Sequence, residues 1–159
     1  MKKTGIASAV LIGVLIASCA PVSSRYGPSS GDLRGWQIEL SEYARSFLGT
    51  PYRHGGSDHS GMDCSGLVVR TYRDVLHITL PRRTTDLLQK GFAVPLEALA
   101  IGDLLFFEEK LGPPPDHVGI YMGDGRFIHA SVSRGVTLSN INESHFRKRF
   151  VGARRVVRE

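Results

Sequence analysis

One cysteine and two histidines have the residue types of a nucleophilic enzyme site. Cys64 lies in an Asp-Cys-Ser-Gly motif at residues 63–66, directly before apolar residues at helical spacing. A thiolate is the reactive form of cysteine, and both a helix N-terminus and a neighbouring histidine lower the pKa of a thiol. His117 and His129 follow on either side of a glycine turn at residues 123–125. We therefore expect a cysteine hydrolase in which Cys64 is the nucleophile, His117 the general base and acid, and His129 the group that orients His117.

Hairpin geometry predicts that the two histidines lie together. With a three-residue loop at 123–125, the facing pairs are Met122 with Arg126, Ile120 with Ile128, and Gly119 with His129. Strand residues alternate between faces, so this register gathers five apolar side chains on one face: Val118, Ile120, Met122, Ile128 and Ala130. A two-residue loop would divide that set, which burial of one face disfavours. His117 and His129 then become diagonal neighbours on the other face, with β-carbons ~7 Å apart, and we expect both to face a cleft.

The elements that must position these residues are helices followed by strands. Apolar residues at helical spacing predict a helix through Leu40–Leu48, ended by Gly49, and a second helix that starts at Cys64. A short helix is expected at Thr85–Gln89. Five strands are predicted: Asp103–Phe107, His117–Met122, Arg126–Ser131, Gly135–Leu138 and Gly152–Val157. This order indicates an α+β fold with an antiparallel sheet.

Residues 1–18 have the pattern of a secretory signal peptide. A positive start precedes an apolar run of 13 residues, and small residues precede Cys19. A cysteine at the cleavage point is typical of a bacterial lipoprotein, in which Cys19 is lipidated and becomes the new N-terminus. The alternative is an uncleaved membrane anchor, which needs ~20 apolar residues. Residues 19–35, rich in Ser, Gly and Pro, are expected to form a flexible tether, and residues 36–159 the single domain.

Charge and cysteine count narrow the class of protein further. The net charge of +5 falls to +3 when the two lysines of residues 1–18 are removed. This mildly basic balance suits an anionic polymer such as cell wall, or membrane headgroups, and no nucleic-acid motif is present. With Cys19 lipidated, Cys64 would be a lone free thiol in an oxidising compartment. Such a thiol is an oxidation hazard, which favours a function for it.

A metal site is the competing chemistry. Asp58, His59, Asp63 and Cys64 could bind zinc together with the hairpin histidines. However, the chain contains neither His-Glu-x-x-His nor a paired Cys-x-x-Cys. We therefore predict no metal and no cofactor.

Six motifs in order resemble the NlpC family of papain-like cell-wall endopeptidases. They are Leu48–Gly56, Asp63–Val68, Leu80–Arg82, Gly102–Phe107, His117–Tyr121 and Phe127–Ser131. The resemblance covers residues 36–157. It implies a papain-like α+β fold, with the nucleophile helix packed on a central antiparallel sheet. It also implies hydrolysis of amide bonds in peptidoglycan stem peptides or cross-links, at D-glutamyl–diaminopimelate or diaminopimelate–D-alanine bonds.

The resemblance also assigns roles to residues around the three already named. It matches Tyr52 to a tyrosine that approaches the oxyanion beside the Cys64 backbone N–H, although a tyrosine here could also be a packing aromatic. It places Asp63 and Ser65 where some relatives contact a substrate amine. Arg82 would support its loop or meet a substrate carboxylate.

Two departures from the family pattern leave substrate choice open. His54 stands where relatives often have an aromatic residue, and a proline run at residues 112–115 precedes His117. Neither departure affects the nucleophile or the two histidines.

The sequence thus predicts a lipid-anchored cysteine endopeptidase of the bacterial envelope. Its partners would be peptidoglycan and, through Cys19, a membrane. Because no Asp follows Cys19, resemblance to Gram-negative lipoproteins favours the outer membrane, with the domain facing the periplasm. The oligomeric state stays open, with a monomer expected. Two alternatives remain: a non-enzymatic lipoprotein that binds cell wall in the same cleft, and a cysteine amidase or transferase acting on another amide or ester.

Overall fold

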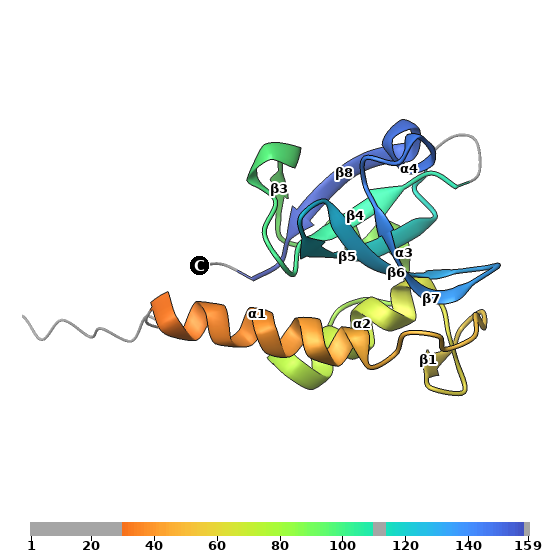
Figure 1. The fold of residues 1–159 in the computed structure, drawn as a ribbon, viewed down its shortest axis with the longest axis horizontal. Coiled ribbons are helices and arrows are strands. Elements are labelled where there is room, and N and C mark those ends of the chain that lie inside the picture. Colours follow the sequence, from red (N-terminus) through yellow and green to blue (C-terminus); the bar gives the residue numbers. More distant parts are fainter. Residues whose placement is uncertain (1–29, 110–113, 158–159) are drawn as a thin grey trace, which may run out of the picture.

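Two helices lie against one face of an antiparallel sheet (Figure 1). The structure, a computed structural model, describes residues 30–109 and 114–157, with side chains from residue 35 onward. Helix α1 spans Ser30–Arg45 and helix α2 spans Cys64–Leu76. The signal peptide predicted at residues 1–18, Cys19 and the tether up to residue 29 lie outside the described residues. Within the described residues, no helix is both long and apolar enough to cross a membrane.

The main sheet has six strands in the order β3-β8-β4-β5-β6-β7, with every neighbouring pair antiparallel. The strands are β3 (Phe92–Val94), β4 (Leu104–Phe107), β5 (His117–Gly123), β6 (Arg126–Ser131), β7 (Gly135–Asn140) and β8 (Phe150–Arg155). The smaller elements are β1 (Ser57–Asp58), β2 (Gly61–Met62), α3 (Thr84–Leu87), the 3₁₀ turn η1 (Leu96–Ala98) and α4 (Ser144–Arg149).

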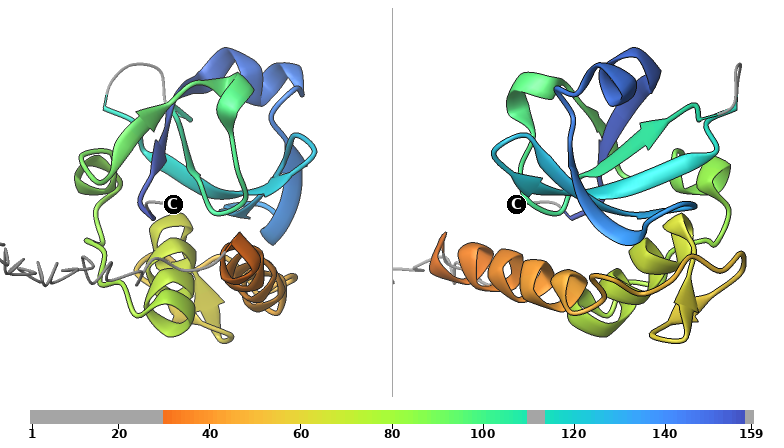
Figure 2. Two further views of the ribbon diagram at one scale, coloured as in Figure 1. Left: turned by 90° about the vertical axis from the view of Figure 1, so that its left-hand side faces the viewer. Right: turned by 45° about the vertical axis from the view of Figure 1, so that its right-hand side comes forward.

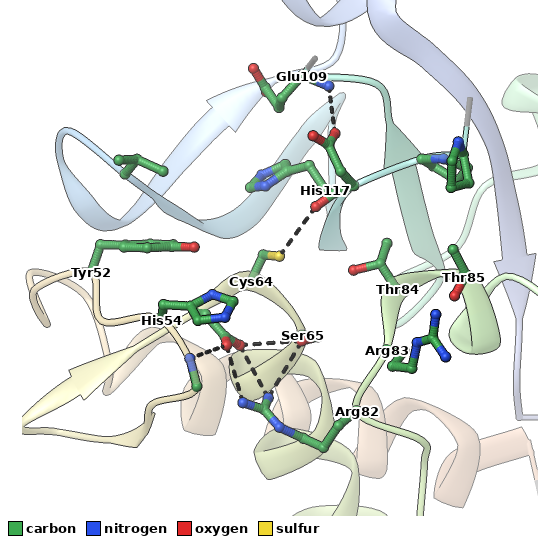
Figure 3. Close-up of a pocket in the computed structure, with 16 residues that line it drawn as sticks. Tyr52, His54, Cys64, Ser65, Arg82, Arg83, Thr84, Thr85, Glu109 and His117 are labelled. Carbon is green, nitrogen blue, oxygen red and sulfur yellow. Dashed lines mark hydrogen bonds and ion pairs between the residues drawn. The ribbon is translucent and has the colours of Figure 1, made fainter. Parts of the chain in front are cut away.

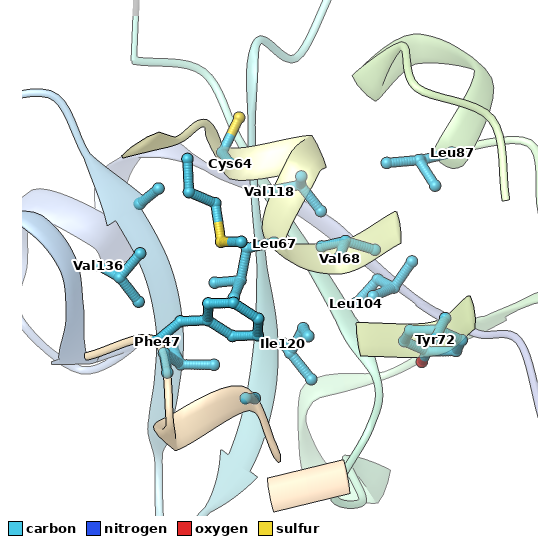
Figure 4. Close-up of a cluster of buried hydrophobic side chains, with 14 of the residues drawn as sticks. Phe47, Cys64, Leu67, Val68, Tyr72, Leu87, Leu104, Val118, Ile120 and Val136 are labelled. Atoms are coloured by element: carbon cyan, nitrogen blue, oxygen red, sulfur yellow. The ribbon is translucent and has the colours of Figure 1, made fainter. Parts of the chain in front are cut away.

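Apolar side chains cover both faces of this sheet. Between the helices and the sheet lies the larger cluster, whose members include Phe47, Leu67, Val68, Tyr72, Val118 and Ile120 (Figure 4). On the opposite face a smaller cluster contains Leu105, Phe107, Phe127 and Phe146. Phe146 comes from α4, which lies on the side of the sheet away from α1 and α2 (Figure 2). The sheet is therefore a middle layer, and neither face of its central strands is open to solvent.

The α+β class with an antiparallel sheet is confirmed, and so is a helix that begins at Cys64. Helix α1 begins at Ser30, within the segment predicted as a tether and before the predicted start of the domain at residue 36. A Ser- and Gly-rich composition indicated a linker, but a packed helix can extend over residues of poor intrinsic propensity. The predicted short helix is shifted, since α3 is Thr84–Leu87. Strand β3 and helix α4 were not predicted.

The β5–β6 hairpin keeps the predicted pairing near the histidines and changes it at the turn. Ile120 pairs with Ile128, as predicted. The pairing of Met122 with Arg126 is wrong, because Gly123 pairs with Arg126 across a two-residue turn at 124–125. Both turn residues have positive φ, 54° and 72°, as the tightest hairpin turns require. A bulge between residues 121 and 123 inserts one extra residue into β5. This insertion offsets the shorter turn, so the five apolar side chains of the hairpin still share one face.

Candidate active site

Cys64 is the first residue of α2 and lies at a cleft, which places its sulfur beside the start of a helix (Figure 3). The preceding residue, Asp63, caps the helix by accepting a 2.6 Å hydrogen bond from the Gly66 backbone N–H. A β-carbon on Gly66 would lie 2.1 Å from the carbonyl oxygen of Gly56. Only glycine therefore lets the loop before β1 pack on the first turn of α2.

Asp63 holds that loop, the helix start and one arginine together. Its carboxylate accepts a bidentate ion pair from Arg82 at 3.1 Å on both oxygens, and a 2.7 Å bond from the Gly55 N–H. The Ser65 hydroxyl donates to it at 3.2 Å. With the Gly66 bond, five donors meet the roughly four lone-pair sites of a carboxylate. The structure therefore shows Asp63, Ser65 and Arg82 bonded to one another within the protein, and Arg82 bonded to the loop that contains Gly56.

Asp63→Ala is expected to lower the free energy of unfolding by about 2–4 kcal/mol. The change removes a helix cap and leaves Arg82 and two backbone N–H groups without their acceptor. Urea unfolding followed by circular dichroism measures this loss. The matched control is Asp58→Ala, in the same β1–β2 hairpin, whose pair with Arg53 is about half exposed. The control should lose much less stability; equal losses for the two variants would contradict the role given to Asp63.

His117 and His129 are joined by a buried hydrogen bond. His117 Nε2 lies 2.8 Å from His129 Nδ1, and His129 Nε2 lies 3.0 Å from the Ser139 hydroxyl on β7. A β-carbon on Gly119, which lies between them on the same face, would be 2.7 Å from Phe127 and 3.2 Å from the β-carbon of His129. Gly119 therefore leaves the space that allows the two rings to meet. The two imidazoles therefore lie together, as the hairpin register predicted.

His129 does not face the cleft, contrary to the prediction. Its exposed fraction is 2%, and its ring packs against Phe127 and Phe146 with centroids 4.9 and 5.4 Å away. The second apolar cluster covers this face, and α4 contributes Phe146 to it. Burial, with the nearby His117 and Arg134, lowers the pKa of His129 to about 3. His129 is therefore neutral in the folded protein and acts only through hydrogen bonds.

His117 lines the cleft and has one ring nitrogen to offer there. Because Nε2 is taken by His129, Nδ1 is the nitrogen that can serve Cys64. Burial lowers the pKa of His117, while the charges of Glu109 and Asp116 oppose that shift. The resting imidazole is therefore neutral and able to accept a proton.

The Cys64 thiol is protonated in this resting state. Burial raises its pKa, and hydrogen bonds from the Val118 and Ser65 N–H groups and from Thr84 oppose that shift without cancelling it. The thiol donates weakly to the Asp116 carbonyl oxygen, 3.9 Å away. The thiol pKa is therefore raised and not lowered as expected from the helix start, and burial is the largest cause. Ionisation of such a thiol needs a base.

Tyr52 points its hydroxyl into the cleft toward Cys64 (Figure 3). Burial, followed by the nearby Cys64 and Asp63, raises the pKa of Tyr52, so the phenol stays a hydrogen-bond donor. Among the described residues, neither this hydroxyl nor the Cys64 backbone N–H has a hydrogen-bond partner. Two free donors thus lie beside the nucleophile, as stabilisation of an oxyanion requires.

The cleft has a volume of about 960 Å³, which suits a peptide rather than a small ion. His54 and Tyr52 lie at one end, and Arg83, Thr84 and Thr85 at the other (Figure 3). Pro114 and Pro115, from the predicted proline run, also line it; residues 112 and 113 of that run lie outside the described part. Within the described residues, no group of three or more His, Cys, Asp or Glu side chains could hold a metal ion.

Sequence reasoning missed Ser139, Arg134, Thr84 and Arg83. Ser139 accepts a 3.3 Å bond from Arg134 and so ends the chain of hydrogen bonds from His117. Ser139 on β7 pairs with Phe127 on β6. A prediction of the β6–β7 register could have placed Ser139 near His129. Thr84 and Arg83 directly follow the Leu-Pro-Arg motif, but nothing local shows that they reach the cleft.

Comparison with known proteins identifies the family of this chain. The chain matches the NlpC/P60 family over residues 49–155. It is 34% identical to the murein DD-endopeptidase MepS/murein LD-carboxypeptidase of Escherichia coli K12, over 94% of this chain and 90% of that protein. It is 38% identical to the probable endopeptidase NlpC of the same strain, over 92% and 96% of the two chains. A crystal structure of an NlpC/P60 family protein from Bacillus cereus is similar with a TM-score of 0.72 and 35% identity, over 77% of this chain and 40% of that one. This chain belongs to the NlpC/P60 family.

Proposed function

We propose that this protein is a cysteine endopeptidase that cleaves amide bonds in peptidoglycan, through Cys64, His117 and His129. The observation that carries the proposal is the buried 2.8 Å bond between His117 and His129, which leaves His117 Nδ1 for the one cysteine among the described residues. The names of two relatives, murein DD-endopeptidase and probable endopeptidase, support the substrate class. The bonds proposed are D-glutamyl–diaminopimelate within a stem, or diaminopimelate–D-alanine in a cross-link.

The reaction begins with proton transfer from the Cys64 thiol to His117 Nδ1, as the sulfur attacks the scissile carbonyl. The oxygen of the tetrahedral intermediate is held by the Cys64 N–H and the Tyr52 hydroxyl. His117 then donates the proton to the leaving amine, and an acyl-thioester remains on Cys64. Water, deprotonated by His117, releases the acyl group and restores the thiol. Throughout, His117 Nε2–H donates to His129, and His129 Nε2–H donates to Ser139, so the ring of His117 keeps its orientation.

Digestion of purified muropeptides by residues 30–159 tests this proposal. Mass spectrometry of the products is expected to show cleavage at one of the two named amide bonds. A cell-wall-binding protein without activity would bind muropeptides and leave them intact. An amidase or transferase of another substrate would leave them intact as well, while a thiol-reactive amide or ester probe still labels Cys64.

We also propose that Cys19 is lipidated and anchors the protein in the envelope, probed by Cys19→Ala in the full chain. The variant is expected to leave the membrane fraction, because the thiol that would carry the lipid is gone, and to keep its activity. Fractionation with immunoblotting measures the distribution. The matched control is Cys64→Ala, which removes the other cysteine and should stay with membranes. Recovery of Cys19→Ala in membranes at the level of the unaltered protein would contradict the anchor.

A further inference from the structure

Two neighbouring arginines in the cleft have different surroundings. Arg82 is held by Asp63 through both carboxylate oxygens, and its second Nη also donates to the Gly56 carbonyl at 3.4 Å. Arg83 has an extended backbone, with φ −83° and ψ 133°. Successive side chains on extended backbone point in opposite directions. Arg82 therefore turns toward the loop beneath the helix start, and Arg83 toward the open cleft (Figure 3).

The carboxylates that line the cleft are engaged elsewhere, so none of them neutralises Arg83. Asp63 pairs with Arg82, Glu109 pairs with His145 at 3.2 Å, and Asp116 accepts from the Glu109 backbone N–H at 2.8 Å. Among the described residues, the Arg83 side chain has no hydrogen-bond or ion-pair partner. The cleft therefore presents one guanidinium whose donors are all free.

Arg83 and the nucleophile line the same cleft. The next residue, Thr84, also lines it and points its side chain toward Cys64 (Figure 3). A group bound by Arg83 would therefore lie in the cleft on the Thr84 side of the nucleophile (Figure 3). Tyr52 and His54 lie at the other end of the cleft and do not compete for that place (Figure 3).

We propose that Arg83 binds a free carboxylate on a substrate residue that adjoins the scissile amide. This inference rests on the proposed peptidase function and narrows its substrate class. The planar guanidinium fork matches a carboxylate with two parallel hydrogen bonds. In an ordinary peptide the α-carboxyl of each residue is consumed in the next amide bond, so no such carboxylate exists in mid-chain. It exists where an amide uses a side-chain carboxyl or amine, or at a chain terminus. Arg83 would thus favour side-chain-linked or terminal peptide bonds over ordinary protein chains.

The test uses one D-glutamyl–diaminopimelate peptide with the carboxylates beside the amide free, and forms in which each is a carboxamide in turn. The unaltered protein should cleave the free form about 10–100-fold faster in kcat/KM than one carboxamide form, the range expected for a charged hydrogen bond. Arg83→Gln should abolish that preference by slowing only the free form, and Arg83→Lys should restore part of it. Arg126→Gln, an exposed arginine at the β5–β6 turn, is the matched control and should keep the full preference.

Binding separates this inference from the proposed function. The same peptides are titrated into Cys64→Ala protein, with and without Arg83→Gln, by calorimetry. If the binding shows an Arg83-dependent preference for the free carboxylate but the unaltered protein cleaves none of the peptides, the subsite stands and the peptidase function is overturned. Cleavage and binding that are equal for the free and amidated forms would overturn the subsite and leave the peptidase standing.

Discussion

Cys64→Ala protein is expected to hydrolyse no muropeptide while it remains folded. Cys64 is the one cysteine among the described residues, and without its sulfur no acyl-thioester can form. The loss should be at least ~10⁴-fold in kcat/KM. Cys64 is 8% exposed and packs at the edge of the larger apolar cluster. Replacement by alanine removes one buried atom, at a cost of about 1 kcal/mol.

The measurement is product release from a defined muropeptide, with a thermal melt of the same sample. Cys64→Ser is the companion variant, since it keeps the volume of the side chain and loses the ionisable thiol. Activity retained by clean, folded Cys64→Ala protein would eliminate the covalent mechanism.

His117→Ala and the His129 variants should separate the roles of the two imidazoles. His117 moves the proton in every chemical step, so His117→Ala should lose ~10²–10⁴-fold or more in kcat. His129 contacts no substrate in this scheme. Gln can replace it, because its carbonyl oxygen can accept from His117 and its amide can donate to Ser139. His129→Gln and His129→Asn should therefore keep measurable activity, while His129→Ala loses much more.

The burial of His129 changes what these variants should do to stability. A cleft-facing side chain could be replaced at little cost in stability, but His129 packs between Phe127 and Phe146. His129→Ala opens a cavity and leaves the buried His117 Nε2 without its partner, so it should lower the free energy of unfolding by about 2–3 kcal/mol. Kinetics must therefore be compared at a temperature where melts show every variant folded. If His129→Gln is then as inactive as His117→Ala, the orienting role is wrong, and His129 must act on the substrate or on Cys64.

Ser139→Ala gives an independent check of the same chain of hydrogen bonds. It removes the acceptor of His129 Nε2 without touching either imidazole. A fall in kcat with unchanged KM is expected, and Ser139→Thr, which keeps the hydroxyl, should restore part of it. Full activity in Ser139→Ala would show that His129 is oriented by its packing alone.

The local sequence pattern determined where Cys64 and the two histidines lie on their own elements. Helical spacing after residue 63 and a capping aspartate place Cys64 at a helix start, because both are properties of adjacent residues. Alternation along β5 and β6 places both histidines on one face, because a side-chain period of two allows only one register that buries the apolar set. The bulge at residue 122 altered the turn and preserved that parity. Nothing beyond the hairpin itself was needed to bring the two imidazoles together.

Only the tertiary structure decided what covers that face and which charges remain free. Phe146 is the one buried residue of a short, polar helix, a pattern too weak to predict a cover for His129. That helix directly precedes β8, which pairs with β3 and β4 across more than 40 residues of sequence. The same applies to the arginines: residues 82 and 83 have the same type, and only the position of Asp63 in space determines which of them is neutralised. Burial raises the pKa of the Cys64 thiol, whereas a helix start by itself would lower it. Desolvation depends on every element packed around the sulfur, so the residues next to Cys64 in the sequence did not determine it.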